Sequence, residues 1–320
     1  MSDRLRLVVV GAGIMGTNHA RVARNVPGAI LVGVIDADLE RARAAARGAD
    51  VEVAASIDEL TTEFDAAVIA LPTPFHRGAA EALAARGVHL LVEKPLAGNV
   101  DDAEAIISAA EDGGIILAVG HIERFNAAVA ELPRLLDQPI HVEASRISPY
   151  SARIGDGVIL DLMIHDIDIV CSLAGPEAEV VDISGVARSV RGSTEDIASI
   201  TMRFSTGLTA TFNTSRLGQQ KIRTVEVTQH DSTIVADLVR QDITIHRMTR
   251  HEYLSDEGAS YRQSSVVEIP FLETRGEPLA LELAHFVQCV RTGSPPRVDG
   301  AAGLRALRLA TAAVAAVHSV

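Results

Sequence analysis

Short apolar runs alternate with amphipathic stretches along the first 120 residues. The apolar runs are rich in β-branched residues and predict strands at 5–10, 30–35, 65–71, 88–92 and 115–119. Helical periodicity predicts helices that begin at Thr17 and that cover 38–46, 77–85 and 100–111. Strands that alternate with helices through short links predict a parallel, doubly wound sheet of the Rossmann type. Its ligand crevice is expected at the carboxyl ends of the strands.

The second part of the chain changes to alternating patterns of period two. They predict consecutive strands at 179–190, 197–204, 208–215, 223–229, 233–238 and 243–248. Helices are expected at 121–136, 157–173, 278–291 and 301–317, and an exposed loop at 256–265. The predicted fold class is therefore α/β: a Rossmann domain at 1–120, then an α+β domain at 121–320 with a large, mainly antiparallel sheet.

The helices suffice to cover one face of that second sheet. Its other face mixes polar and apolar positions, as at Thr209, Thr211, Asn213 and Ser215. Such a face is suited to a contact between two sheets. We therefore expect a homodimer or homotetramer that pairs through the C-terminal sheet, with this domain serving both substrate binding and oligomerisation.

Composition narrows the class of partner and the compartment. The 320 residues carry 29 Lys and Arg against 42 Asp and Glu, a net charge of −13, which argues against nucleic acid. No stretch of 18 apolar residues is free of charge, so no membrane segment is expected. The two cysteines, Cys171 and Cys289, form no metal or redox pair, so we expect a reducing, cytoplasmic location and no metal site.

The first predicted strand runs directly into the pattern G-x-G-x-x-G, formed by Gly11, Gly13 and Gly16 with Ile14 and Met15 between them. The first glycine allows a tight turn, the second lets a pyrophosphate approach the backbone, and the third allows close packing of helix on strand. The second strand ends in Asp36, 20 residues beyond Gly16, where a ribose-binding acid is expected. The combination predicts a dinucleotide site.

The residues after the second strand bear on the choice of cofactor. Ala37 and Asp38 follow Asp36, with no Ser, Thr or Arg directly there to receive a 2′-phosphate. Two carboxylates would repel that phosphate, so the expected cofactor is NAD rather than NADP. Arg41 stands close enough to leave NADP tolerance open.

Three further motifs follow. Leu71-Pro72-Thr73-Pro74-Phe75-His76 and Glu93-Lys94-Pro95 lie at the ends of predicted strands, and Asp161 and His165 lie at i, i+4 on a predicted helix. This combination resembles the Gfo/Idh/MocA oxidoreductases, which include glucose–fructose oxidoreductase and inositol dehydrogenase. The resemblance covers essentially the whole chain, although Leu71 stands where Thr is more usual. It implies that Leu71, Pro72, His76, Glu93 and Lys94 lie at the cofactor, with Lys94 near the nicotinamide.

The resemblance also implies an activity, oxidation of a secondary hydroxyl of a sugar, nucleotide sugar or inositol. His165 is expected to take the hydroxyl proton, because an imidazole titrates near working pH. Asp161 is expected to fix the tautomer of His165, and Lys94 to stabilise the negative charge that develops on the oxygen. These three residues are thus both catalytic and substrate-binding candidates. Glu93 either pairs with Lys94 or shapes the turn.

The segment Gly120-His121-Ile122-Glu123-Arg124-Phe125-Asn126 resembles the subgroup of UDP-N-acetylglucosamine 3-dehydrogenases. Arg124 and Asn126 either contact substrate or cap and pair at the domain junction. Arg124, Arg146 and Arg153 are candidates for binding the phosphates of a nucleotide sugar. Two other functions stay open: a non-catalytic NAD-binding sensor, and an enzyme that recycles a tightly bound NAD as catalyst.

Overall fold

The computed structural model describes residues 4–150, 156–255 and 258–319. The chain forms two compact units: unit 1, Met1–Phe125 with Gly276–Leu309, and unit 2, Asn126–Arg275 with Ala310–Val320. This division differs from a single boundary after residue 120, because α7 (Pro278–Thr292) and most of α8 (Gly300–Ala316) belong to unit 1. Leu279, Leu283 and Phe286 of α7 lie in the same buried apolar cluster as the first strand.

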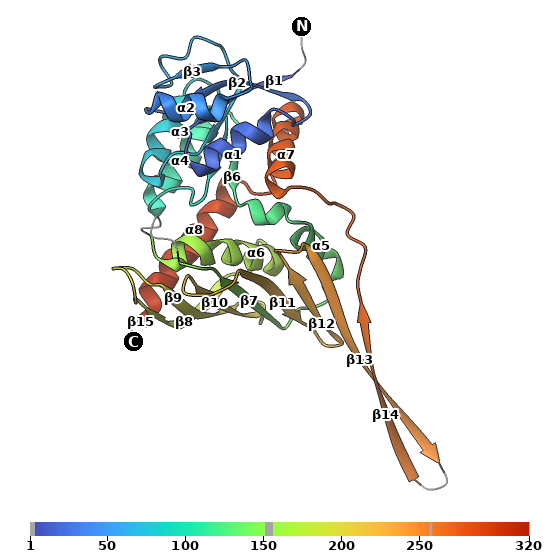
Figure 1. The fold of residues 1–320 in the computed structure, drawn as a ribbon. Helices are drawn as coiled ribbons and strands as arrows, with labels where there is room; N and C mark the ends of the chain where they lie inside the picture. Colours follow the sequence, from blue (N-terminus) through green and yellow to red (C-terminus); the bar gives the residue numbers. More distant parts are fainter. Residues whose placement is uncertain (1–3, 151–155, 256–257, 320) are drawn as a thin grey trace. The chain divides into compact units, whose positions relative to one another are not determined.

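Unit 1 is built on a six-stranded parallel sheet of order β3-β2-β1-β4-β5-β6 (Figure 1). The strands are β1 Leu5–Val10, β2 Ala29–Ile35, β3 Glu52–Ala54, β4 Ala66–Ile69, β5 His89–Glu93 and β6 Leu117–Gly120. Its other helices are α1 Ile14–Ala23, α2 Leu39–Ala46, α3 His76–Ala84 and α4 Val100–Asp112. The strand order reverses between β1 and β4, and this switch point is where doubly wound sheets bind ligands. The predicted Rossmann sheet is confirmed.

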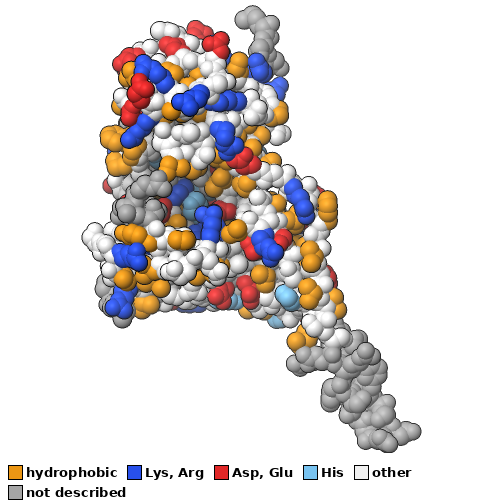
Figure 2. All heavy atoms as spheres, viewed as in Figure 1, with side chains coloured by type: hydrophobic (Ala, Val, Ile, Leu, Met, Phe, Trp, Pro, Cys, Tyr) orange, Lys and Arg blue, Asp and Glu red, His pale blue; other side chains and the backbone are white. Residues whose placement is uncertain are grey.

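The surface of unit 1 carries charges of both signs. On the face seen in Figure 2, acidic and basic side chains lie next to one another. On α2, Arg43 pairs with Glu40, and Arg41 pairs with Asp38 at the start of the helix. Among the described residues, no helix is long and apolar enough to cross a membrane.

Unit 2 holds a nine-stranded sheet of order β14-β13-β12-β11-β7-β10-β9-β8-β15. The strands are β7 His141–Ile147, β8 Val180–Arg188, β9 Ile197–Phe204, β10 Thr209–Ser215, β11 Ile222–Thr228, β12 Ser232–Asp237, β13 Asp242–Ser255, β14 Gly258–Glu268 and β15 Val317–Ser319. The pairs β7–β10 and β8–β15 are parallel and the other neighbours antiparallel, which confirms a mainly antiparallel sheet. Helices α5 (Ala127–Leu135) and α6 (Ile164–Ala174) cover one face (Figure 1).

Sequence patterns missed three strands of this sheet, β7, β14 and β15, and one of unit 1, β3; β15 follows directly on the helix predicted at 301–317. Strand β7 buries a charged residue, Arg146, at a position where alternation calls for an apolar one. Residues 258–265 are part of strand β14, so the loop predicted at 256–265 is wrong over that part; residues 256 and 257 lie outside the described ones. The paired strands β13 and β14 extend past the rest of the sheet (Figure 1). Strand β3 is three residues long and lies at an edge.

Candidate cofactor site and catalytic residues

The turn between β1 and α1 depends on two glycines that allow close approach. Gly11 has a φ of +97°, and a Cβ there would lie 2.5 Å from the carbonyl oxygen of Ala70. A Cβ on Gly16 would lie 1.7 Å from the carbonyl oxygen of Gly11. Any side chain at either position would therefore push the turn away from β4 or α1 away from the turn.

Gly13 differs from the other two glycines, because no heavy atom lies within 4 Å of where its Cβ would be. It is the N-cap residue of α1, so backbone N–H groups at the start of that helix point into open space. Ile14 is 66% exposed beside it, and Met15 is half-buried. A surface that exposes backbone N–H groups at a helix N-terminus suits a pyrophosphate.

Asp36 closes the other side of this turn. One carboxylate oxygen accepts a hydrogen bond from the N–H of Ala12 at 2.6 Å, and the other accepts from the N–H of Asp38 at 2.8 Å. A carboxylate offers about four lone-pair positions, so two remain for the hydroxyls of a ribose. The residues present therefore fit an adenine dinucleotide with a free 2′-hydroxyl.

The loops after β4 and β5 are joined by His76, which is buried. Its Nε2 lies 2.9 Å from the carbonyl oxygen of Leu71, and its Nδ1 lies 3.1 Å from that of Pro95. Pro72 precedes the short 3₁₀ turn Thr73–Phe75 that leads into α3. His76 thus holds the two predicted cofactor loops at a fixed spacing.

Glu93 shapes the turn that carries Lys94. Its carboxylate lies 2.7 Å from Nε2 of the buried His19, and its second oxygen accepts the backbone N–H of Lys94 at 3.2 Å. Burial opposes ionisation of Glu93, but the hydrogen bond and charge of His19, with the charge of Lys94, hold its pKa below the usual range. The peptide bond between Lys94 and Pro95 is cis, and Lys94 is half-buried.

In unit 2 the predicted helix at 157–173 begins with one π-helical turn, Ile159–Met163, which continues into α6. Asp161 lies in the π turn and His165 in α6, and both are half-buried. A π turn holds more residues than an α turn, so the α-helical spacing from which the sequence placed Asp161 and His165 on one face does not apply within Ile159–Met163. Such turns occur often at functional sites.

A buried ion pair links this segment to strand β7 of the sheet. Arg146 of β7 and Asp166 of α6 form two hydrogen bonds, at 2.9 and 2.7 Å, and both side chains are buried. These bonds and its burial give Arg146 a structural role in pairing with Asp166, which disfavours it as a ligand for a substrate phosphate. Arg153, the other phosphate candidate of unit 2, lies outside the described residues.

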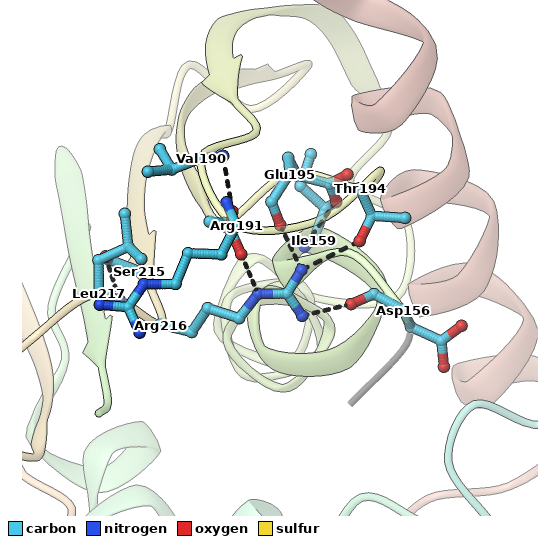
Figure 3. Close-up of polar contacts among 10 residues, drawn as sticks. Asp156, Ile159, Val190, Arg191, Thr194, Glu195, Ser215, Arg216 and Leu217 are labelled. Carbon is cyan, nitrogen blue, oxygen red and sulfur yellow. Dashed lines mark hydrogen bonds and ion pairs between the residues drawn. The ribbon is translucent and has the colours of Figure 1, made fainter. Parts of the chain in front are cut away.

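The start of the π turn is fixed by Glu195, which the sequence did not single out. The carboxylate of Glu195 accepts the N–H of Ile159 at 3.1 Å (Figure 3). The carbonyl oxygen of Glu195 accepts the N–H of Val158, also at 3.1 Å. A Cβ on Gly157 would lie 2.0 Å from that carboxylate, so Gly157 is required for this contact. A carboxylate at a helix N-terminus is also favourable electrostatically.

Arg216 holds the loop around Glu195 in place. Its guanidinium donates to the carboxylate of Asp196 at 2.6 Å, to the carbonyl oxygen of Asp156 at 2.7 Å and to the hydroxyl of Thr194 at 3.0 Å (Figure 3). Burial disfavours the charge of Asp196. The backbone N–H groups of Arg191 and Val190, with Arg216, nevertheless lower its pKa to about 2. The segment that carries Asp161 and His165 is thus held by two buried ion pairs, Arg146 with Asp166 and Arg216 with Asp196.

The two remaining candidates differ in their surroundings. Asn126 is buried and caps α5: its side-chain oxygen accepts the N–H of Ala128 at 3.1 Å, and its amide donates to the carbonyl oxygen of Leu238 at 2.8 Å. These bonds match the capping role of the two that the sequence left open. Arg124 is half-buried in the 3₁₀ turn Ile122–Phe125, and its carbonyl oxygen accepts Nη1 of Arg297 at 3.0 Å.

Comparison with known proteins defines the class. Residues 5–121 match the model of an oxidoreductase family with an NAD-binding Rossmann fold, and residues 150–319 match that family's C-terminal α/β domain. The chain therefore belongs to the Gfo/Idh/MocA family. It is a dehydrogenase, and its cofactor is NAD.

Named relatives extend over nearly the whole chain. UDP-N-acetylglucosamine 3-dehydrogenase of Acidithiobacillus ferrooxidans is 31% identical over 98% of this chain and 98% of its own. A solved structure of that protein has a TM-score of 0.86 at 30% identity, and the match covers 98% and 97% of the two chains. NAD-dependent scyllo-inositol 2-dehydrogenase of Bacillus subtilis is 30% identical over 93% of this chain and 90% of its own.

Proposed function

We propose that this dehydrogenase oxidises a secondary hydroxyl of a sugar, nucleotide sugar or cyclitol, and that UDP-N-acetylglucosamine, at C3, is its substrate. The similarity to UDP-N-acetylglucosamine 3-dehydrogenase over 98% of both chains carries this choice within the family. The inositol dehydrogenases are similar over less of the chain or at lower identity.

The cofactor residues in this proposal are those at the switch point of unit 1. Gly11, Gly13 and Gly16, with Ile14 and Met15, receive the pyrophosphate, and Asp36 receives the ribose hydroxyls. Leu71, Pro72 and His76, with Glu93 and Lys94, line the nicotinamide end. The carbonyl contacts of His76 and the N–H contact of Glu93 support a shaping role for these two side chains.

Bound NAD supplies the hydride acceptor, and the chain supplies position and proton transfer. His165 accepts the proton of the substrate hydroxyl as general base. Asp161 orients the imidazole and stabilises the imidazolium. Lys94 donates to the same oxygen and stabilises its developing charge. The fixed ends of both segments, at Glu93 for Lys94 and at Glu195 for the π turn, support this assignment.

Arg124 is the better candidate of the two remaining substrate contacts, because the side-chain oxygen and amide of Asn126 are both bonded to its own unit. An arginine at this position suits the diphosphate of a nucleotide sugar.

A substrate panel tests the proposal. Purified protein is incubated with NAD and, separately, UDP-N-acetylglucosamine, UDP-glucose, free N-acetylglucosamine, scyllo-inositol and myo-inositol, and NADH is followed by its fluorescence. We expect multiple turnovers with UDP-N-acetylglucosamine and a kcat/KM at least about tenfold lower for the others, which corresponds to about 1.4 kcal/mol. A preference for an inositol would refute the nucleotide-sugar choice. NAD binding without turnover on any of them would favour the sensor or the recycled cofactor.

A further inference from the structure

Unit 1 contains a carboxyl group that the proposed chemistry does not use. Glu282 of α7 is buried, and neither of its carboxyl oxygens has a hydrogen-bond partner among the described residues. Leaving a buried carboxylate unpaired is far more costly than leaving a neutral acid so, because the ionic form loses its solvation. The charge state of Glu282 is therefore decisive for the stability of this part of the unit.

Within the described ranges, no cation pairs with the carboxyl group of Glu282. It lines a cavity of about 10 Å³ together with His285, Phe125, Phe286, Leu91 and Val298. A cavity of this size holds at most one water, which supplies a hydrogen bond but no charge. Burial, with the nearby Arg297, lowers the pKa of His285, and the backbone N–H of Arg297 donates to its Nε2, so this imidazole is neutral.

Other charged groups stand on elements near α7, but none of the described residues forms a hydrogen bond with the carboxyl oxygens of Glu282. These groups are His19, Glu93, Lys94, His121, Glu123, Arg124 and Arg297. Arg297 lies with its guanidinium 4.9 Å from the centre of the Phe125 ring and donates to a carbonyl oxygen. The charge that acts on Glu282 is that of Glu93, a like charge.

Burial and the charge of Glu93 therefore act in the same direction and raise the pKa of Glu282 well above its usual value. Glu93 has the opposite balance, because His19 and the N–H of Lys94 bond its carboxylate. Two neighbouring acids with different partners divide in this way into one neutral acid and one carboxylate.

We propose that Glu282 is a positioning residue for Lys94: as a neutral acid it leaves Glu93 as the only negative charge of the pair, and that charge anchors the turn carrying Lys94. The inference rests on the proposed role of Lys94 for its catalytic part only. Ionisation of Glu282 would place a second negative charge beside Glu93 and compete for His19 and Lys94. The neutral form of Glu282 thus preserves the geometry of the turn.

The charge of Glu282 is tested without substrate. Unfolding by urea is measured between pH 5.5 and 8.5 for the wild type, Glu282→Gln and Glu111→Gln, the last of which removes an exposed carboxylate of the same unit. A folded state that holds one extra proton loses stability as pH rises above the unfolded pKa, until its own raised pKa is reached. The unfolding constant of the wild type relative to Glu282→Gln should therefore rise about tenfold per pH unit, or about 1.4 kcal/mol.

Glu111→Gln should show no such slope relative to the wild type. Glu282→Met keeps the side-chain length without a charge and should reproduce the slope of Glu282→Gln, so the test stands even if one variant folds poorly. A ratio independent of pH in both variants overturns the proposal, because Glu282 would then be ionised in the folded state.

The positioning role is tested by kinetics near neutral pH. Glu93→Gln removes the anchoring charge and should lower kcat at least about tenfold with little change in NADH affinity. Glu282→Ala should also lower kcat, and Glu282→Gln, the isostere of a neutral acid, should restore it and retain activity to higher pH than the wild type. Equal losses in Glu282→Ala and Glu282→Gln overturn the role. If no substrate is turned over, the proposed function fails, while the stability slope still decides the charge of Glu282.

Discussion

The preference for NAD over NADP should depend on the negative charge of Asp36. A 2′-phosphate placed at the ribose position would face the carboxylate of Asp36 at a few ångströms. Two unit charges 4 Å apart repel by about 1 kcal/mol in water and about 4 kcal/mol near a protein surface. NADH should therefore bind at least about tenfold more tightly than NADPH.

The informative variant is Asp36→Asn, which keeps the shape and one acceptor oxygen for the N–H of Ala12, although its amide NH2 replaces the oxygen that accepts the N–H of Asp38. It removes the charge, so each hydrogen bond to a ribose hydroxyl weakens from the charged to the neutral range. For two hydroxyls the loss is about 1–3 kcal/mol, and NADH affinity should fall about fivefold to a hundredfold. NADPH affinity should stay the same or rise, so the preference should nearly disappear.

Asp38→Asn provides the matched control. Asp38 caps α2 through the N–H groups of Glu40 and Arg41, and Asn caps equally well. Asp38 also pairs with the exposed guanidinium of Arg41 at 3.1 Å. Loss of the charge of Asp38 should leave NADH affinity nearly unchanged. It should improve NADPH binding, because the guanidinium of Arg41 is then free of its ion pair and can approach the 2′-phosphate. Fluorescence titration of both cofactors measures all of this. An Asp36→Asn variant that keeps the full wild-type preference would refute the reasoning.

Further predictions concern catalysis, the glycine turn and assembly. Lys94→Ala and His165→Ala should each lower kcat by about 10²–10⁴-fold with NADH affinity nearly unchanged, and Asp161→Asn should lower kcat less. Steady-state kinetics and cofactor titration measure these effects, and full turnover by His165→Ala would require another base. Gly13→Ala should fold, because its Cβ meets no protein atom, but it should lose NADH affinity, because that Cβ occupies space left for the pyrophosphate. Gly16→Ala should fail to form the turn, because its Cβ would lie 1.7 Å from a carbonyl oxygen. Thermal unfolding and NADH titration separate the two variants, and normal NADH binding by Gly16→Ala would contradict the role of this turn. Light scattering at micromolar concentration should show a dimer or tetramer paired through the face of the large sheet opposite α5 and α6; a monomer would contradict the oligomer prediction.

Much of unit 1 could be predicted from the sequence because its strands are buried on both faces and its helices are amphipathic. Val8, Val9 and Ile69 lie in such strands and are fully buried. Strand β3 could not be found in this way, because its burial is only partial over three residues at an edge. The glycine pattern and Asp36 were identifiable because their local geometry follows from few residues.

The contacts that hold the segment of Asp161 and His165 could not be predicted, because they involve partners distant in sequence. The sequence predicts Arg146 as an available cation, but the structure shows it bonded to Asp166, 20 residues away. Arg216 is 60 residues from Asp156, and Glu195 is 36 residues from Ile159. The only sequence signal for the contact at Glu195 is Gly157, whose missing side chain leaves room for the carboxylate. The π turn at Asp161 has no signature in the pattern of apolar residues.

In the proposed reaction, hydride leaves C3 of a nucleotide sugar for NAD while Lys94 and His165 act on the oxygen of that carbon. UDP-N-acetylglucosamine deuterated at C3 tests it most directly, with mass spectrometry of the cofactor and of the sugar after many turnovers. We expect deuterium in the released, reduced cofactor, a 3-keto sugar without deuterium, and formation of both products at least about a hundredfold more slowly with His165→Ala. Deuterium that stays on the sugar, or a cofactor that remains unlabelled while the sugar changes, would contradict the account.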